Sequence, residues 1–79
     1  ADSYLLVLRY APSAEDALRE VLKRLPAAKV KSKRSNKSGE ELVLELRLSA
    51  EQTELLNRIR EIPAVSEVNL VSNHSDVQL

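Results

Sequence analysis

The strongest chemical signal in this chain is a run of positive charge. Residues 21–39 contain seven Lys or Arg and no Asp or Glu, although the whole chain balances 12 basic against 12 acidic residues. Five of the seven lie on one expected strand and the turn after it: Lys29, Lys31, Lys33, Arg34 and Lys37. Such a strand could bind an anion or a nucleic acid. It could also be a lysine-rich edge strand that resists aggregation and pairs with Glu41 and Glu45. We favour the edge strand, because these glutamates would neutralise much of its charge.

Nucleic-acid binding is also disfavoured by the scarcity of aromatic residues. A sheet that reads RNA stacks bases on aromatic side chains of its central strands. The only aromatic residues here are Tyr4 and Tyr10, at the two ends of the first expected strand. A nucleic-acid-associated module using the basic strand 29–37 therefore remains the second alternative function.

No residue set has the spacing of a catalytic, metal or cofactor site. The chain has no cysteine, which removes thiolate ligands and cysteine nucleophiles. The single histidine, His74, has only Asp76 nearby, whereas a metal site needs three or four ligands. Ser13 and Ser49 have no histidine base in their neighbourhood. We expect no enzymatic activity, no cofactor and no metal.

The expected helices and strands that position these residues occur as a repeat of two similar units. Residues 13–30 read Ser-Ala-Glu, an amphipathic run, Pro-Ala and a strand, and residues 49–68 repeat that order. Apolar residues at three- and four-residue steps predict a helix in each unit, stopped by Pro26 and by Pro63. Ser13 and Ser49 are the expected N-caps of these helices. Asp16 and Gln52 lie three residues after them, as capping-box partners.

Alternation predicts four strands. Leucines at every second position from Leu42 to Leu48 predict a strand with one buried face. The run Tyr4–Tyr10 is apolar on both faces and should be central. A turn at 36–39 joins the second and third strands. Keeping the leucines in register puts Lys29, Lys31 and Lys33 on the same face as Glu41, Val43 and Glu45.

This order of elements predicts an α+β fold: a ferredoxin-like β-α-β-β-α-β sandwich. We expect a four-stranded antiparallel sheet of order 4-1-3-2, with two helices on one face. We expect residues 1–79 to form one domain, with 73–79 as a short tail or terminal turn. The expected core is Leu18, Leu22, Leu44, Leu46, Leu56, Ile59 and Val68.

The helix-free face of the predicted sheet is the candidate interaction surface. Alternation places Leu5, Val7, Val43 and Val71 there, among charged residues. An uncovered, partly apolar face is typical of a surface that meets a partner. The partner would be the same domain, in a weak homodimer, or another part of the parent protein.

The closing strand resembles that of ACT-like domains, with Pro63, Val65, Val68 and Leu70 in a Pro-x-Val-x-x-Val-x-Leu pattern. The hairpin 33–48 and the ending 65–76 are similar to soluble C-terminal domains of bacterial membrane proteins of the MgtC/SapB type and related uncharacterised families. The resemblance implies a cytoplasmic domain tethered to the inner membrane through an N-terminal region. Amino-acid-binding ACT domains have Asp-x-x-Gly after the first strand. This chain has Ala-Pro-Ser-Ala at 11–14, so no ligand residue is carried over.

We therefore expect a non-enzymatic regulatory or interaction domain that acts by self-association or by intramolecular contact. The first alternative is a small-molecule sensor for an amino acid or an anion. The sequence has no apolar run long enough to span a membrane, so we expect no direct membrane insertion. It begins without Met in a strand-forming segment, and we expect it to belong to a longer protein.

Overall fold

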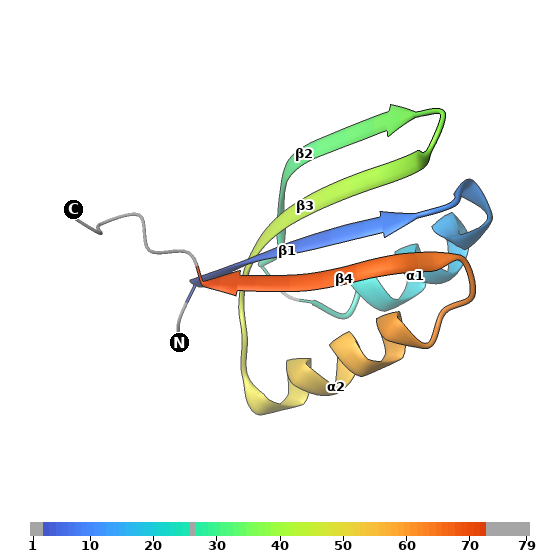
Figure 1. The fold of residues 1–79 in the computed structure, drawn as a ribbon. Coiled ribbons are helices and arrows are strands. Elements are labelled where there is room, and N and C mark those ends of the chain that lie inside the picture. The colour runs from blue at the N-terminus through green and yellow to red at the C-terminus, as the bar shows by residue number, and fades with distance from the viewer. Residues whose placement is uncertain (1–2, 26, 73–79) are drawn as a thin grey trace, which may run out of the picture.

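The computed structural model describes residues 3–25 and 27–72, which form one antiparallel sheet with two helices below it (Figure 1). The strands are β1 (Ser3–Tyr10), β2 (Lys29–Asn36), β3 (Gly39–Arg47) and β4 (Val65–Ser72). The helices are α1 (Glu15–Leu22), which follows a 3₁₀ turn at Pro12–Ala14, and α2 (Ala50–Arg60). The strand order is β2-β3-β1-β4. The predicted α+β class and strand order are confirmed.

Strand β1 is central because it is apolar on both faces. It pairs antiparallel with β3 on one side and with β4 on the other. Leu6 and Leu8 point toward the helices and are fully buried, whereas Leu5 and Val7 point to the other face and are half-buried. One face of β1 is therefore covered by the helices, and the other face is left open.

The core lies between the sheet and the helices, as the leucine alternation predicted. Five of the seven expected core residues are buried, whereas Leu22 and Val68 are only partly buried at its margin. The buried set is Leu6, Leu8, Tyr10, Ala14, Leu18, Leu25, Leu42, Leu44, Leu46, Leu56 and Ile59.

The two helices begin differently. Ser49 caps α2, and its backbone N–H donates to Oε1 of Gln52 at 2.7 Å, as predicted. The prediction that Ser13 caps α1 is wrong. Pro12 fixes its own φ and opens a 3₁₀ turn, in which the N–H of Ala14 bonds to the carbonyl of Ala11 at 2.9 Å. Ser13 therefore lies inside this turn rather than at a helix N-cap.

Among residues 3–25 and 27–72, three backbone positions have positive φ. Ala27 (φ 60°) and Ala64 (φ 71°) occupy equivalent places in the two repeats, after the end of each helix. Gly39 (φ 126°) begins β3, and a Cβ there would lie 2.8 Å from the carbonyl oxygen of Tyr10. The only glycine in the chain is thus required by both its conformation and its neighbour.

Lys31 is an extra residue in β2. Val30 lies opposite Leu44, but the next pair in the ladder is Ser32 with Val43. One residue is therefore accommodated without a counterpart on β3, which is a β-bulge.

The bulge changes which face Lys33 occupies. Lys33 lies opposite Leu42, on the helix-covered side, and its Nζ is 2.8 Å from Oε1 of Glu15. The prediction that Lys33 shares a face with Glu41 and Glu45 is wrong, because one added residue shifts the alternation that follows.

Candidate functional site

The four apolar candidates on the open sheet face are neighbours. Val7 lies opposite Val43, and Leu5 lies opposite Val71, so the residues form a stripe across β3, β1 and β4. We call this set the open-face stripe. Leu5, Val7 and Val43 are half-buried, whereas Val71 is 49% exposed. No described helix or strand covers the stripe, because both helices lie on the opposite side (Figure 1).

Arg9 organises the charges at one end of the stripe. Its Nη2 is 2.8 Å from Oε2 of Glu41, and its Nε is 3.2 Å from Oε1 of Glu67. Both glutamates lie directly opposite Arg9 on the adjoining strands. Nδ2 of Asn69 donates to Oε2 of Glu67 at 2.7 Å. Half-exposed pairs of this kind contribute little stability, so their main effect is to orient the charged rim.

The predicted anion-binding strand does not present its charges on one surface. Lys31 and Arg34 turn to the open face, where each approaches a glutamate of β3 at 3.8 Å, Glu45 and Glu41 respectively. Lys33 turns to the helix side. The charges of β2 are thus divided between two faces.

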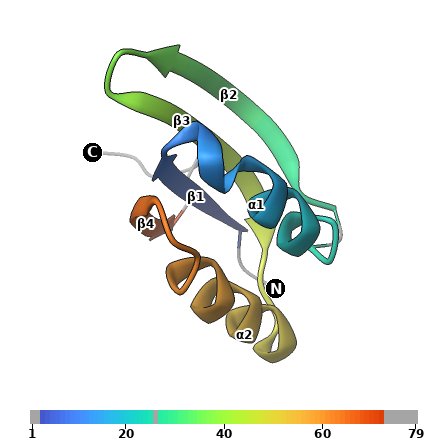
Figure 2. The same cartoon turned by 90° about the vertical axis from the view of Figure 1, so that its right-hand side faces the viewer.

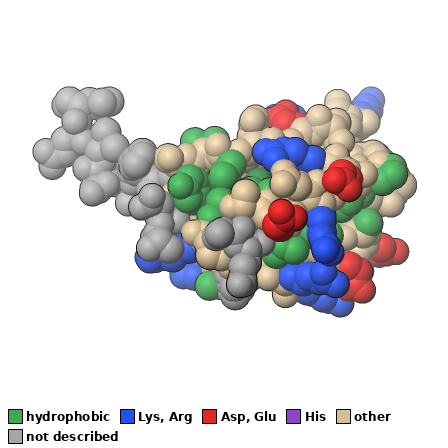
Figure 3. Space-filling model, turned by 90° about the horizontal axis from the view of Figure 1, so that it is seen from below, with side chains coloured by type: hydrophobic (Ala, Val, Ile, Leu, Met, Phe, Trp, Pro, Cys, Tyr) green, Lys and Arg blue, Asp and Glu red, His purple; other side chains and the backbone are tan. Residues whose placement is uncertain are grey.

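The other two basic candidates are also separated. Lys29 lies opposite Glu45 near the start of β2, and Lys37 is exposed in the turn after it. On the side of the molecule seen in Figure 3, acidic and basic side chains are intermixed. Because Lys31 and Arg34 lie on the open face, Lys33 lies on the helix side and Lys37 lies in the turn, the run of basic residues is not gathered on one face.

The helix side of β2 holds a feature that sequence reasoning missed. An apolar groove of about 470 Å³, which we call the α1–β2 groove, is lined by residues of helix α1 and strand β2. Figure 2 shows how these two elements are arranged. Its charged or polar lining residues are Tyr10, Glu15, Arg19, Lys23 and Lys33. Its apolar lining residues are Leu18, Leu22, Leu25, Ala28, Val30, Leu42 and Leu44.

Val30 is the residue that could have indicated this groove. It is the only apolar residue of β2, lies opposite Leu44 on the helix side, and is nevertheless 65% exposed. An apolar side chain that faces a core without being covered marks the margin of that core. The sequence shows Val30 among lysines, but the gap beside α1 depends on the packing of the helix.

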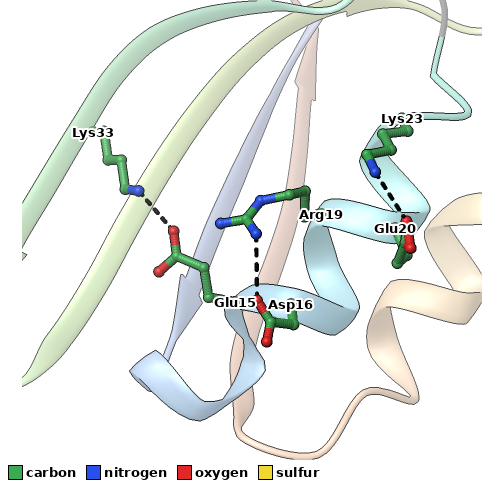
Figure 4. Close-up of polar contacts among 6 residues, drawn as sticks. All are labelled: Glu15, Asp16, Arg19, Glu20, Lys23 and Lys33. Atoms are coloured by element: carbon green, nitrogen blue, oxygen red, sulfur yellow. Dashed lines mark hydrogen bonds and ion pairs between the residues drawn. The ribbon is translucent and has the colours of Figure 1, made fainter.

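An ion pair spans the groove at one end. Figure 4 shows Lys33 reaching from β2 to Glu15 on α1. The hydrogen bond from Lys33 lowers the pKa of the Glu15 carboxyl, and the same bond raises the pKa of Lys33. Burial raises the pKa of the Tyr10 phenol, and the negative charge of Glu15 raises it further. Three titratable groups thus interact at this end of the groove.

The chemical inventory of the described residues is limited. Within residues 3–25 and 27–72, no three His, Cys, Asp or Glu side chains gather as metal ligands would. His74, Asp76 and the expected tail at 73–79 lie outside the described residues. In that same part of the chain, no helix has the length and apolarity needed to cross a membrane.

Compared with known proteins, the chain matches no family model, no curated protein and no solved structure. Its function must be inferred from its own residues.

Proposed function

We propose that this chain is a non-enzymatic interaction domain that associates with a second copy of itself through the open-face stripe. The observation that carries the proposal is the contiguity of the two apolar pairs, Val7 with Val43 and Leu5 with Val71, on an uncovered sheet face. Burial of such side chains against a partner is favourable by about 25 cal/mol per Å² of apolar surface.

The charges around the stripe favour a second copy over a polyanion. In a two-fold dimer a surface meets itself, so a surface of one sign would repel its partner. The open face carries both signs, with Arg9 and Arg34 beside Glu41, and Lys31 beside Glu45. Tight oligonucleotide binding at physiological salt would instead favour the nucleic-acid alternative.

The association should be weak. A standard interface buries roughly 800 Å² per partner, about a seventh of the 5590 Å² surface of this chain. Four side chains supply only part of that area. A tether that holds two copies close together would strengthen the contact through effective concentration.

We also propose a ferredoxin-like sandwich, which the β-α-β-β-α-β order and the antiparallel β2-β3-β1-β4 sheet support. The closing-strand pattern of Pro63, Val65, Val68 and Leu70 supports an ACT-like domain, and the sequences of the hairpin 33–48 and of the ending 65–76 support the MgtC/SapB type. In such a protein the domain would act in the cytoplasm, tethered to the inner membrane. The sequence that flanks this chain tests the tether: hydrophobic spans before residue 1 would support it, and their absence from the full protein would refute it.

Sedimentation equilibrium over a hundredfold range of concentration tests the association. We expect a weak monomer–dimer equilibrium that Val43→Glu abolishes, because the new carboxylate would be buried at the centre of the interface. The fold should survive, since Val43 faces away from the helices and is half-buried.

Val30→Glu is the matched control. Val30 lies on the neighbouring strand but on the helix side of the sheet, so the same substitution there should leave association unchanged. If Val43→Glu fails to fold, Val43→Lys replaces it, because Glu41 and Glu45 flank that position on the same face and would accept a cation. A strict monomer at all concentrations, or a dimer indifferent to both Val43 variants, would overturn the proposal.

A further inference from the structure

We infer that the α1–β2 groove binds a small amphipathic carboxylate. Its alkyl chain would lie along Leu22 and Val30, and its carboxylate would accept from the Tyr10 hydroxyl and Lys33 Nζ. The groove lies on the helix side of the sheet, and the open-face stripe lies on the other. The inference therefore stands independently of the proposed self-association.

The Tyr10 hydroxyl is the observation that points to a ligand. Tyr10 lines the groove and is only 4% exposed, yet its hydroxyl makes no hydrogen bond with any described residue. Every fully sealed side-chain nitrogen or oxygen in the described structure has a partner. The Tyr10 hydroxyl is therefore accessible to solvent, and Tyr10 is one of the residues that line the groove. Tyr10 as a whole residue is nearly buried, but its hydroxyl is open to solvent, so a ligand oxygen in the groove would accept its hydrogen bond in place of water.

The charged side chains that line the groove are mostly basic, and each basic one also pairs with a carboxylate of α1. Lys33, Arg19 and Lys23 line it, against one acidic residue, Glu15. Lys33 lies at the same end as Tyr10, since both are close enough to Glu15 to interact with it electrostatically. The ion pair between Lys33 and Glu15 is exposed to solvent, so a ligand carboxylate can replace Glu15 at moderate cost.

Arg19 and Lys23 are also available to an anion. Each pairs at 3.3 Å with a carboxylate of its own helix, Asp16 and Glu20 respectively, and all four side chains are exposed (Figure 4). Exposed pairs within a helix are weak, and they leave both cations free to reorient.

The apolar lining residues and the volume of the groove suit a small molecule with an apolar chain. The volume of about 470 Å³ falls within the range of small-molecule sites, roughly 300–1,000 Å³. Leu22 and Ala28 are half-buried beside it, and Val30 is largely exposed. These side chains offer an apolar track that leads away from Tyr10, and an unbranched alkyl chain would cover it.

Titration of the isotope-labelled protein with decanoate, followed by NMR, tests the inference. We expect saturable binding with a Kd of about 1 mM or tighter, from the affinity typical of a ligand with this number of atoms. Amide shifts should change around Tyr10, Leu22 and Val30 and stay constant around Val7 and Val43. Decyltrimethylammonium has the same chain with a cationic head and should bind at least about 10-fold more weakly.

Three variants locate the ligand. Tyr10→Phe removes only the hydroxyl and should weaken decanoate binding about 10-fold, as expected for the loss of a hydrogen bond to a charged group. Val30→Glu should weaken it by at least as much, through repulsion. Val43→Glu, on the other face, should have no effect and serves as the control. If Tyr10→Phe does not fold, Lys33→Gln tests the same end, because Lys33 is exposed.

The inference would be overturned by any of three results. The first is a failure of decanoate to saturate the protein below its micelle threshold. The second is equally strong binding of the cationic detergent. The third is binding of decanoate to Tyr10→Phe and Val30→Glu as strong as to the unmodified chain. None of these results would bear on the sedimentation test, since that test concerns the opposite face.

Discussion

Two alanines hold the left-handed backbone conformation that glycine adopts most easily. Ala27 and Ala64 follow the two helices at equivalent repeat positions, with φ of 60° and 71°. The left-handed region costs an ordinary residue roughly 1–2 kcal/mol. Glycine removes that cost but loses more conformational entropy on folding, roughly 0.5–1 kcal/mol.

We therefore predict that Ala64→Gly stabilises the domain by up to about 1 kcal/mol. Urea denaturation measures the change in the free energy of unfolding. Ala17→Gly is the matched control: Ala17 is an exposed residue inside α1, where glycine should cost about 1 kcal/mol. Equal destabilisation by both substitutions would contradict the conformational explanation.

The pair formed by Glu15 and Lys33 makes stability depend on pH in a defined way. The pKa of Glu15 is lowered in the folded state, so its contribution is present above the ordinary value of 4.5 and is lost as pH falls through the folded pKa. The pKa of Lys33 is raised, so its contribution is present below 10.5 and is lost as pH rises through the folded pKa.

We predict that Glu15→Gln lowers the thermal unfolding temperature most between pH 4.5 and 10.5, and that the difference disappears toward both extremes. Thermal melts of both proteins across this range measure it. Glu54→Gln, which removes a carboxylate from α2 away from the groove, should show no such window. A difference between Glu15→Gln and the unmodified chain that is constant with pH would rule out the ion pair as its cause.

At the scale of the element, β3 offers a direct comparison of the two sheet faces. Leu44 is 3% exposed and faces the helices, whereas its neighbour Val43 is half-buried on the open face. Leu44→Ala should destabilise the domain by about 2–5 kcal/mol, since truncation of a buried leucine leaves a cavity. Val43→Ala should cost about 1 kcal/mol. Chemical denaturation distinguishes them, and equal losses would mean that the sheet faces are assigned incorrectly.

The elements that could be predicted from the sequence are those with a strong apolar pattern. Leu42, Leu44 and Leu46 alternate without interruption, so the faces of β3 follow directly from the printed residues. In contrast, β2 has one apolar residue, Val30, and its charges tolerate either face. No periodicity marks Lys31 as an extra residue, so the face of Lys33 could not be predicted.

The two candidate surfaces also differ in whether they could be predicted from the sequence. The residues of the open-face stripe could be named from strand alternation, because a sheet face is defined by local periodicity. The α1–β2 groove depends on how far the helix extends over the sheet, which is a tertiary distance. Tyr10 could be assigned to the core from its position on β1, but its unpartnered hydroxyl depends on surroundings that lie far apart in the sequence.

At the scale of the whole molecule, one sheet separates two surfaces of different chemistry. The open face joins apolar pairs to a rim of both charge signs, and the helix side adds a groove with an excess of basic residues. Val43 and Val30 lie on neighbouring strands but on opposite sides of that sheet. A single substitution at either position can therefore disable one surface and spare the other.

Counting outward from the hairpin turn shows what the bulge achieves. From Asn36 opposite Gly39 back to Ser32 the ladder is regular. If that register continued, Lys31 would lie opposite Leu44 and would place its ammonium group on the helix side, among the leucines. Val30 would then lie opposite Glu45 and would point to the open face. The one added residue reverses this outcome and returns Val30 to the leucine side. A strand composed mostly of lysine, arginine and serine can thereby join the sheet with its single apolar side chain on the helix side, at the margin of the core, and without placing Lys31 there.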